Sequence, residues 1–171
     1  MRFAFLALLS LSWPAFAGSL EGRVIEVVDG RTITVLAREG SSLHRIRLVG
    51  IQAPGKQGIA GSASRESLRR LLSGKNVRVE ATELDAKGRL LGTVLVIRAN
   101  NDCGGQPCAP LLDPGISQLA TGHALIESNM LGRLSEETQK RYAVAQEQAK
   151  SSRTGIWRDP TLMLRADFRP E

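Results

Sequence analysis

The dipeptide Asp29-Gly30 is the feature that most constrains the fold of this chain. It separates an apolar-rich run that ends at Val28 from residues 32–35, in which polar and apolar side chains alternate. An Asp-Gly pair between two such runs is the strongest short-range signal for a β-hairpin. Arg31 follows the pair directly. The sequence therefore predicts a hairpin with a cation just past its turn.

Further short strands and helices are predicted on the same grounds of alternation, apolar stripes and turn residues. The expected strands cover residues 22–28, 31–38, 43–50, 77–81 and 90–97. The expected helices cover residues 62–73, 116–125 and about 136–153, the last with Ser135 as its N-cap. This order predicts an α+β fold, in which a five-stranded barrel carries one inserted helix and C-terminal helices.

The N-terminus has the pattern of a secretory signal peptide. Arg2 gives it a charged start, residues 3–11 are mainly apolar, and Ala15-Phe16-Ala17 is a small-residue cleavage site. The apolar run is too short to span a bilayer. We therefore expect a leader over residues 1–17, one domain over residues 18–158 and a tail over residues 159–171. The expected location is periplasmic or extracellular, without a membrane span.

The charge balance favours anionic partners. The chain has 23 Lys and Arg against 17 Asp and Glu, a net charge of +6, and loss of Arg2 with the leader lowers it to +5. A basic exported protein is suited to nucleic acid, phosphoryl groups or an anionic surface. Charge of this size is equally compatible with plain solubility. We expect a monomer.

Cys103 and Cys108 are the two cysteines, and Gly and Pro residues lie between them. Export would place them in an oxidising compartment, where a pair this close in sequence favours a disulfide over free thiols. Neither His44 nor His123 has ligand spacing to the pair, so no cysteine–histidine metal site is predicted.

Several motifs, in order and at consistent spacing, resemble the staphylococcal nuclease (thermonuclease-like) family over residues 22–157. They are VVDGRTI at 27–33, RLVGIQAP at 47–54, LLSGKNV at 71–77, KGRLLG at 87–92, AQEQAK at 145–150 and GIW at 155–157. The resemblance implies a five-stranded OB-fold barrel that carries helices. It also implies an ancestry of calcium-dependent hydrolysis of DNA and RNA phosphodiesters.

The family site is only partly present. In the family, two carboxylates hold calcium, a glutamate aligns the attacking water and two arginines grip the phosphate. The resemblance matches Arg47 and Arg89 to those arginines. At the three acid positions this chain has Arg31, Gln52 and Gly55. The chain therefore resembles the family but departs from it at each catalytic acid.

These departures bear directly on the chemistry. Calcium takes six to eight oxygen ligands, with carboxylates among them. Arg31 repels the ion, Gln52 offers one neutral oxygen, and Gly55 has no side chain to orient water. The sequence therefore predicts neither a metal site nor a cofactor at these positions. Whether any enzymatic activity remains is left open.

The cations that remain predict a phosphate-binding groove. Arg31, Arg47 and Arg89 would line it, with Lys56 and Lys87 nearby. Guanidinium groups bind phosphate oxygens in bidentate fashion. The leading hypothesis is a binder of nucleic acid or another phosphorylated polyanion, in which Arg31 replaces the charge of calcium. Alternatively, Arg31 is a drifted surface residue.

Two other functions stay open at this stage. One is an active, divalent-metal-dependent nuclease that has relocated its acids to Asp29, Glu83 or Asp85, although Asp29 is also favoured simply as a turn residue. The other is an exported protein-interaction module that uses the loop over residues 100–115. Calcium is expected only for the first of these.

Overall fold

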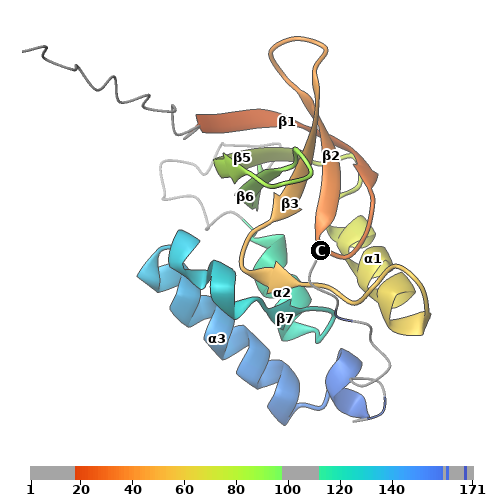
Figure 1. Ribbon diagram of the computed structural model, residues 1–171. Helices are drawn as coiled ribbons and strands as arrows, with labels where there is room; N and C mark the ends of the chain where they lie inside the picture. The colour runs from red at the N-terminus through yellow and green to blue at the C-terminus, as the bar shows by residue number, and fades with distance from the viewer. Residues whose placement is uncertain (1–17, 98–111, 160, 162–167, 169–171) are drawn as a thin grey trace, which may run out of the picture.

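The computed structural model describes residues 18–97, 112–159, 161 and 168 (Figure 1). The predicted leader, the cysteine pair and most of the predicted tail lie outside the described residues. The elements in chain order are β1 (Gly18–Val27), β2 (Thr32–Ala37), β3 (Leu43–Leu48), β4 (Ile51–Gln52), α1 (Ile59–Leu72), β5 (Asn76–Leu84), β6 (Leu90–Val96), α2 (Pro114–Ala120), β7 (Leu125–Ile126), the 3-10 helix η1 (Ser128–Arg133), α3 (Glu136–Ser151) and the 3-10 helix η2 (Gly155–Arg158).

Five strands form a closed barrel in the order β1-β2-β3-β6-β5. Neighbouring strands are antiparallel except β3 and β6, which run parallel. Alternation sets the inner face: in β5, Val77, Val79 and Ala81 are buried and the residues between them are exposed. The predicted α+β architecture, a five-stranded OB-like barrel with helices, is confirmed.

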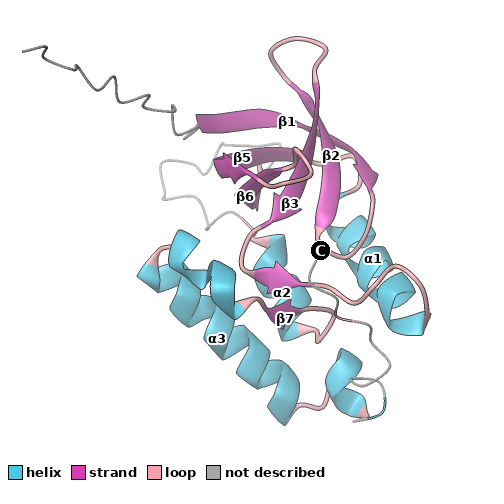
Figure 2. Ribbon diagram, in the orientation of Figure 1, coloured by secondary structure: helices cyan, strands magenta, loops and turns pink. Residues whose placement is uncertain are grey.

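The helices gather on one side of the barrel (Figure 2). Helix α2 packs against β6, α1 and α3, so it lies at the centre of this side. Leu68 and Leu72 of α1, Leu119 of α2 and Tyr142 of α3 join the barrel residues in one hydrophobic core. None of the helices in the described part of the chain is both long and apolar enough to cross a membrane.

The clearest differences from the predicted helices are at the start of α1 and at both ends of α2. Helix α1 begins at Ile59, three residues earlier than expected. The N-cap of α3 is as predicted, because Ser135 Oγ accepts a hydrogen bond from Thr138 N at 3.2 Å. The helix expected over residues 116–125 is wrong at both ends. Asp113 caps α2 directly before Pro114, and the helix ends at Ala120, with Thr121 as its C-cap and Gly122 just beyond it at a φ of +66°.

The sequence did not predict the small sheet formed by β4 and β7. Ile51 pairs with Ile126 and Gln52 with Leu125, and none of the expected strands covers these four residues. Two-residue strands are too short to show alternation. Strand β4 follows β3 in the chain, and its partner β7 leads into Glu127, which completes the candidate site.

Candidate anion-binding site

The Asp29-Gly30 turn is held from three sides. Asp29 Oδ1 accepts a hydrogen bond from Arg31 N at 2.9 Å, the expected local role of an aspartate in a turn. Gln118 of α2 donates from Nε2 to the Gly30 carbonyl oxygen at 2.9 Å. A Cβ at Gly30 would overlap the Ser64 side chain of α1, which explains the glycine. The turn is therefore fixed against two helices, and the backbone of Arg31 with it.

Arg31 and Arg47 converge on Glu127. Arg47 Nη2 lies 2.6 Å from Glu127 Oε1 and 2.7 Å from Oε2, and Arg31 Nη1 lies 3.7 Å from Oε2. The two arginines are each 4% exposed and Glu127 is 9% exposed. Arg31 is therefore not a surface residue. We call Arg31, Arg47 and Glu127 the arginine–glutamate cluster.

Glu127 reaches the arginines through the β4–β7 sheet. It follows Ile126 in the chain, and its backbone N–H donates to the Gly50 carbonyl oxygen at 3.0 Å. Gln146 of α3 supports the strand, because its Oε1 accepts a hydrogen bond from Ile126 N at 2.9 Å. A residue 80 positions from Arg47 in sequence is thus placed beside it by tertiary structure.

The cluster carries one more positive than negative charge. Its two guanidinium groups face one carboxylate in a setting where charges are largely withdrawn from water. Burying charge is costly unless it is paired and hydrogen-bonded. Within the described part of the chain, Arg47 Nε is buried without a hydrogen-bond partner. Arg47 therefore retains a donor that Glu127 does not use.

Arg89 is paired separately, at the turn between β5 and β6. Its Nε lies 2.6 Å from Asp85 Oδ2, and Asp85 Oδ1 accepts from the backbone N–H groups of Lys87 and Arg89, each at 2.9 Å. Burial of Asp85 acts to raise its pKa. The hydrogen bonds from Arg89 and Lys87 outweigh burial and leave the pKa of Asp85 below its ordinary value.

Sheet register relates the two arginine positions. Arg47 of β3 is the register partner of Leu91 in β6, and Arg89 precedes Leu91 by two residues. Arg89 lies one residue before β6 begins, so it is close in the chain to the part of β6 that pairs with Arg47. Its own carboxylate partner, Asp85, comes from the turn.

The two predicted lysines are more accessible. The Lys56 side chain is 58% exposed and its Nζ lies 3.9 Å from Asp29 Oδ2, while Lys87 is exposed on the β5–β6 turn. Lys56 also lines a cavity of about 350 Å³ between the Asp29 turn and α1, to which Arg65 and Arg69 contribute. The predicted phosphate-binding residues thus divide into buried arginines and exposed lysines.

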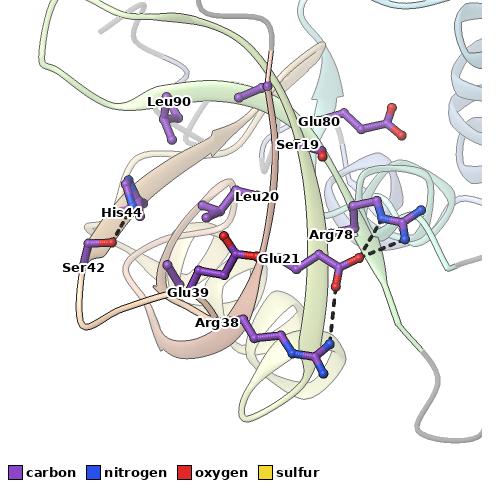
Figure 3. A pocket seen from close by; sticks show the side chains of 13 residues that line it. Ser19, Leu20, Glu21, Arg38, Glu39, Ser42, His44, Arg78, Glu80 and Leu90 are labelled. Carbon is purple, nitrogen blue, oxygen red and sulfur yellow. Dashed lines mark hydrogen bonds and ion pairs between the residues drawn. The ribbon is translucent and has the colours of Figure 1, made fainter.

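A larger cavity, of about 830 Å³, lies where β2 ends and β3 begins, away from the Asp29-Gly30 turn (Figure 3). Three of its charged residues pair with one another: Glu21 lies 2.9 Å from Arg78 Nη2 and 3.6 Å from Arg38 Nη1, while Glu39 and Glu80 also line the cavity. His44 Nε2 lies 3.1 Å from Ser42 Oγ. None of Arg31, Arg47 and Glu127 lines this cavity, so it is separate from the arginine–glutamate cluster.

Comparison with known proteins identifies the family. The model of the staphylococcal nuclease homologue family matches residues 45–159. The chain belongs to this family. It is 31% identical over 163 residues to Protein ParB of Escherichia coli, and the match covers 92% of this chain and 82% of that protein. It is 31% identical over 157 residues to a micrococcal nuclease of Shigella flexneri, covering 89% and 81%.

An uncharacterized endonuclease of Escherichia coli O157:H7 is 40% identical over 89 residues. That match covers 52% of this chain and 57% of the endonuclease, so the chain spans little more than half the length of this relative. The staphylococcal nuclease family and the resemblance found in the sequence are therefore in agreement.

The residues at the family's acid positions do not fit calcium. Arg31 is a buried cation, Gln52 is half-buried in β4, and Gly55 has no side chain. Nearby carboxylates are already engaged, Glu127 by two guanidinium groups and Asp29 by Arg31 N. Within residues 18–97 and 112–159, no group of three or more His, Cys, Asp or Glu side chains has the arrangement of a metal site. We derive no reaction step through calcium.

Glu127 was missed by sequence reasoning. It follows a short apolar run and precedes a 3-10 helix, and nothing in its neighbours distinguishes it from a surface acid. The signal lies in the β4–β7 pairing, which the sequence did not predict. The other proposed acids are also occupied: Glu83 pairs with Arg133 at 2.5 Å and Asp85 pairs with Arg89.

Proposed function

We propose that this member of the staphylococcal nuclease family binds nucleic acid or another phosphorylated polyanion without calcium-dependent hydrolysis. The observation that carries the proposal is the arginine–glutamate cluster. Where the family chemistry needs carboxylates around a cation, this chain buries Arg31 beside Arg47. A fixed positive charge attracts a phosphate, but it does not activate water.

Binding would combine two kinds of cation. Lys56 and Lys87 are exposed, so a phosphate in solution can approach both side chains. Arg31, Arg47 and Arg89 are buried and supply fixed positive charge, each close to a carboxylate. Three or four phosphates neutralised on a single strand would give a salt slope of about −2 to −3.

Export is part of the same proposal. The leader pattern over residues 1–17 supports secretion, and a periplasmic or extracellular protein would meet nucleic acid released from cells. Determining the N-terminal residue of protein recovered from outside the cytoplasm tests this step. We expect Gly18 at the N-terminus, and a retained Met1 would contradict export by cleavage.

The test of function measures cleavage and binding in the same samples. Purified protein is incubated with fluorescein-labelled single-stranded DNA and RNA, in calcium and in EDTA, and read by gel and by anisotropy. We expect intact oligonucleotide and equal affinity in both conditions. Calcium-dependent cleavage that follows the protein through purification, and that alanine at Asp29, Glu83 or Asp85 abolishes, would establish a nuclease with relocated acids instead.

A further inference from the structure

Glu127 occupies the position that a bound anion would take. Both of its carboxylate oxygens lie within 2.7 Å of Arg47 Nη2, and Oε2 also faces Arg31. A carboxylate and a phosphodiester each present two charged or partly charged oxygens to a guanidinium. The two anions therefore compete for the same donors.

The interaction between Arg47 and Glu127 is not the strongest that these groups can make. A full bidentate pair uses two nitrogens of the guanidinium, one for each oxygen. Here both oxygens meet the same nitrogen, and Arg47 Nε has no hydrogen-bond partner among the described residues. The arginine thus has a donor that its resident carboxylate does not use.

A second unused polar atom lies on the same face of the sheet. Thr32 is the register partner of Arg47 across β2 and β3, and directly opposed side chains share a face. Thr32 Oγ1 is likewise buried with no hydrogen-bond partner in the described part of the chain. A buried polar group without a partner is costly, so Arg47 Nε and Thr32 Oγ1 are hydrogen-bonding groups on one face that an additional polar partner could satisfy.

The segment that carries Glu127 lies outside the barrel, although Ile126, Met130 and Leu131 pack against the hydrophobic core. It follows β7, a strand of two residues, and leads into η1, which contributes no fully buried residue. Withdrawal of Glu127 would disturb a short sheet and a surface helix but not the barrel. Displacement of Glu127 from Arg47 therefore requires movement of this short segment while the barrel stays intact.

We propose that Glu127 is a built-in competitor, an internal anion that a ligand phosphate displaces from Arg31 and Arg47. This inference rests on the proposed binding function and adds a selectivity to it. A single phosphate gains little by exchanging with a carboxylate already in place. A polyanion is additionally held by the exposed cations Lys56 and Lys87, so chains of phosphates bind in preference to isolated ones.

The test is Glu127→Gln, which keeps the shape and removes the charge. Its control is Glu147→Gln on α3, whose side chain is 72% exposed and pairs with Lys150. Affinity for a fluorescein-labelled oligothymidylate is measured by anisotropy across a salt series. We expect Glu127→Gln to bind about tenfold more tightly, because a like charge no longer opposes the phosphate. The salt slope should steepen by about 0.7 for each additional phosphate that the arginines neutralise.

Two further variants keep the inference falsifiable. If Glu127→Gln fails to fold, Glu127→Asp retains the charge but shortens the side chain by one methylene, and we expect a several-fold gain in affinity. Adding Arg47→Gln to Glu127→Gln should remove the gain. Affinity equal to wild type in Glu127→Gln, or in Glu127→Asp where that alone folds, would overturn the inference, as would a gain that survives loss of Arg47.

The outcomes separate this inference from the proposed function. Wild-type protein that binds in EDTA, with Glu127→Gln binding no more tightly, would remove the competitor and leave the binding function intact. Wild type and Glu127→Gln that both fail to bind DNA or RNA would overturn both. A free phosphate or nucleoside monophosphate that binds wild type as tightly as the oligothymidylate would contradict the predicted selectivity.

Discussion

Arg47 and Arg89 occupy corresponding roles in the family resemblance, yet they are held in different ways. The partner of Arg89 is Asp85, four residues away on the same turn, and that carboxylate also accepts two backbone N–H groups. The partner of Arg47 is Glu127, 80 residues away and supported by a two-residue strand. The first pair is a local turn motif. The second exists only when the whole site is assembled.

This difference predicts which pair is more easily disrupted. Asp85 keeps its backbone hydrogen bonds when the Arg89 side chain is removed, so its carboxylate still has hydrogen-bond donors. Glu127 has its charge balanced by the buried guanidinium groups. Loss of one partner from a buried ion pair is strongly destabilising because the other charge stays buried.

The largest expected effect is that of Arg47→Gln. It leaves the Glu127 carboxylate in a buried site with its closest cation gone, and we expect a loss of about 3–5 kcal/mol in the free energy of unfolding. Urea denaturation followed by tryptophan fluorescence measures this. A loss below about 1 kcal/mol would indicate that Glu127 reaches water easily, and would weaken the comparison with Asp85.

Arg89→Gln should cost less, about 1–2 kcal/mol, because Asp85 retains two backbone donors. The same urea titration, run beside Arg47→Gln, provides the measurement. If the two variants lose equal stability, the distinction between a local and an assembled pair is wrong.

Asp85 also predicts a dependence on pH. Its pKa is lowered in the folded state from a usual value of 3.8. A lowered carboxyl pKa stabilises the fold fully above the usual value, and this stabilisation is lost as the pH falls through the lowered one. Asp85→Asn should therefore flatten the acid end of the plot of unfolding midpoint against pH. An acid limb as steep as that of wild type would assign the dependence to other carboxylates.

The smallest effect on stability is expected for Lys56→Ala. Its ion pair with Asp29 is exposed on the lysine side, so the free energy of unfolding should change by less than about 0.5 kcal/mol. Oligonucleotide affinity should fall about two- to threefold, and the salt slope should become shallower by about 0.7, because one fewer phosphate is neutralised. Unchanged binding would place the ligand away from this turn.

Much of the fold could be predicted from local patterns. The Asp29-Gly30 turn, the alternation in β5 and the Ser135 cap each depend on residues a few positions apart, and each is found in the structure. Helix α2 was misplaced because its caps, Asp113 and Thr121, enclose a helix of only seven residues, which is too short for a clear apolar period.

The site could be predicted only in part. Family spacing identified Arg47 and Arg89 and the replacement at Arg31. It could not identify Glu127, since an interaction across 80 residues depends on pairing between β4 and β7 that leaves no periodic pattern. The burial of Arg31 and Arg47 could not be predicted either, because both pack against Glu127, which the β4–β7 pairing places. The sequence therefore indicated the cations, and the structure shows which anion they hold.

The central claim is that the site contains its own anion and has no place for calcium. The most direct test is the thermal unfolding midpoint of the full chain in calcium, compared with magnesium and with sodium chloride of equal ionic strength. A ligand that binds the folded state stabilises it by about 2.7 kcal/mol at 100 times its dissociation constant. We predict no difference between calcium and its controls. A saturable rise in midpoint with calcium alone would contradict the account.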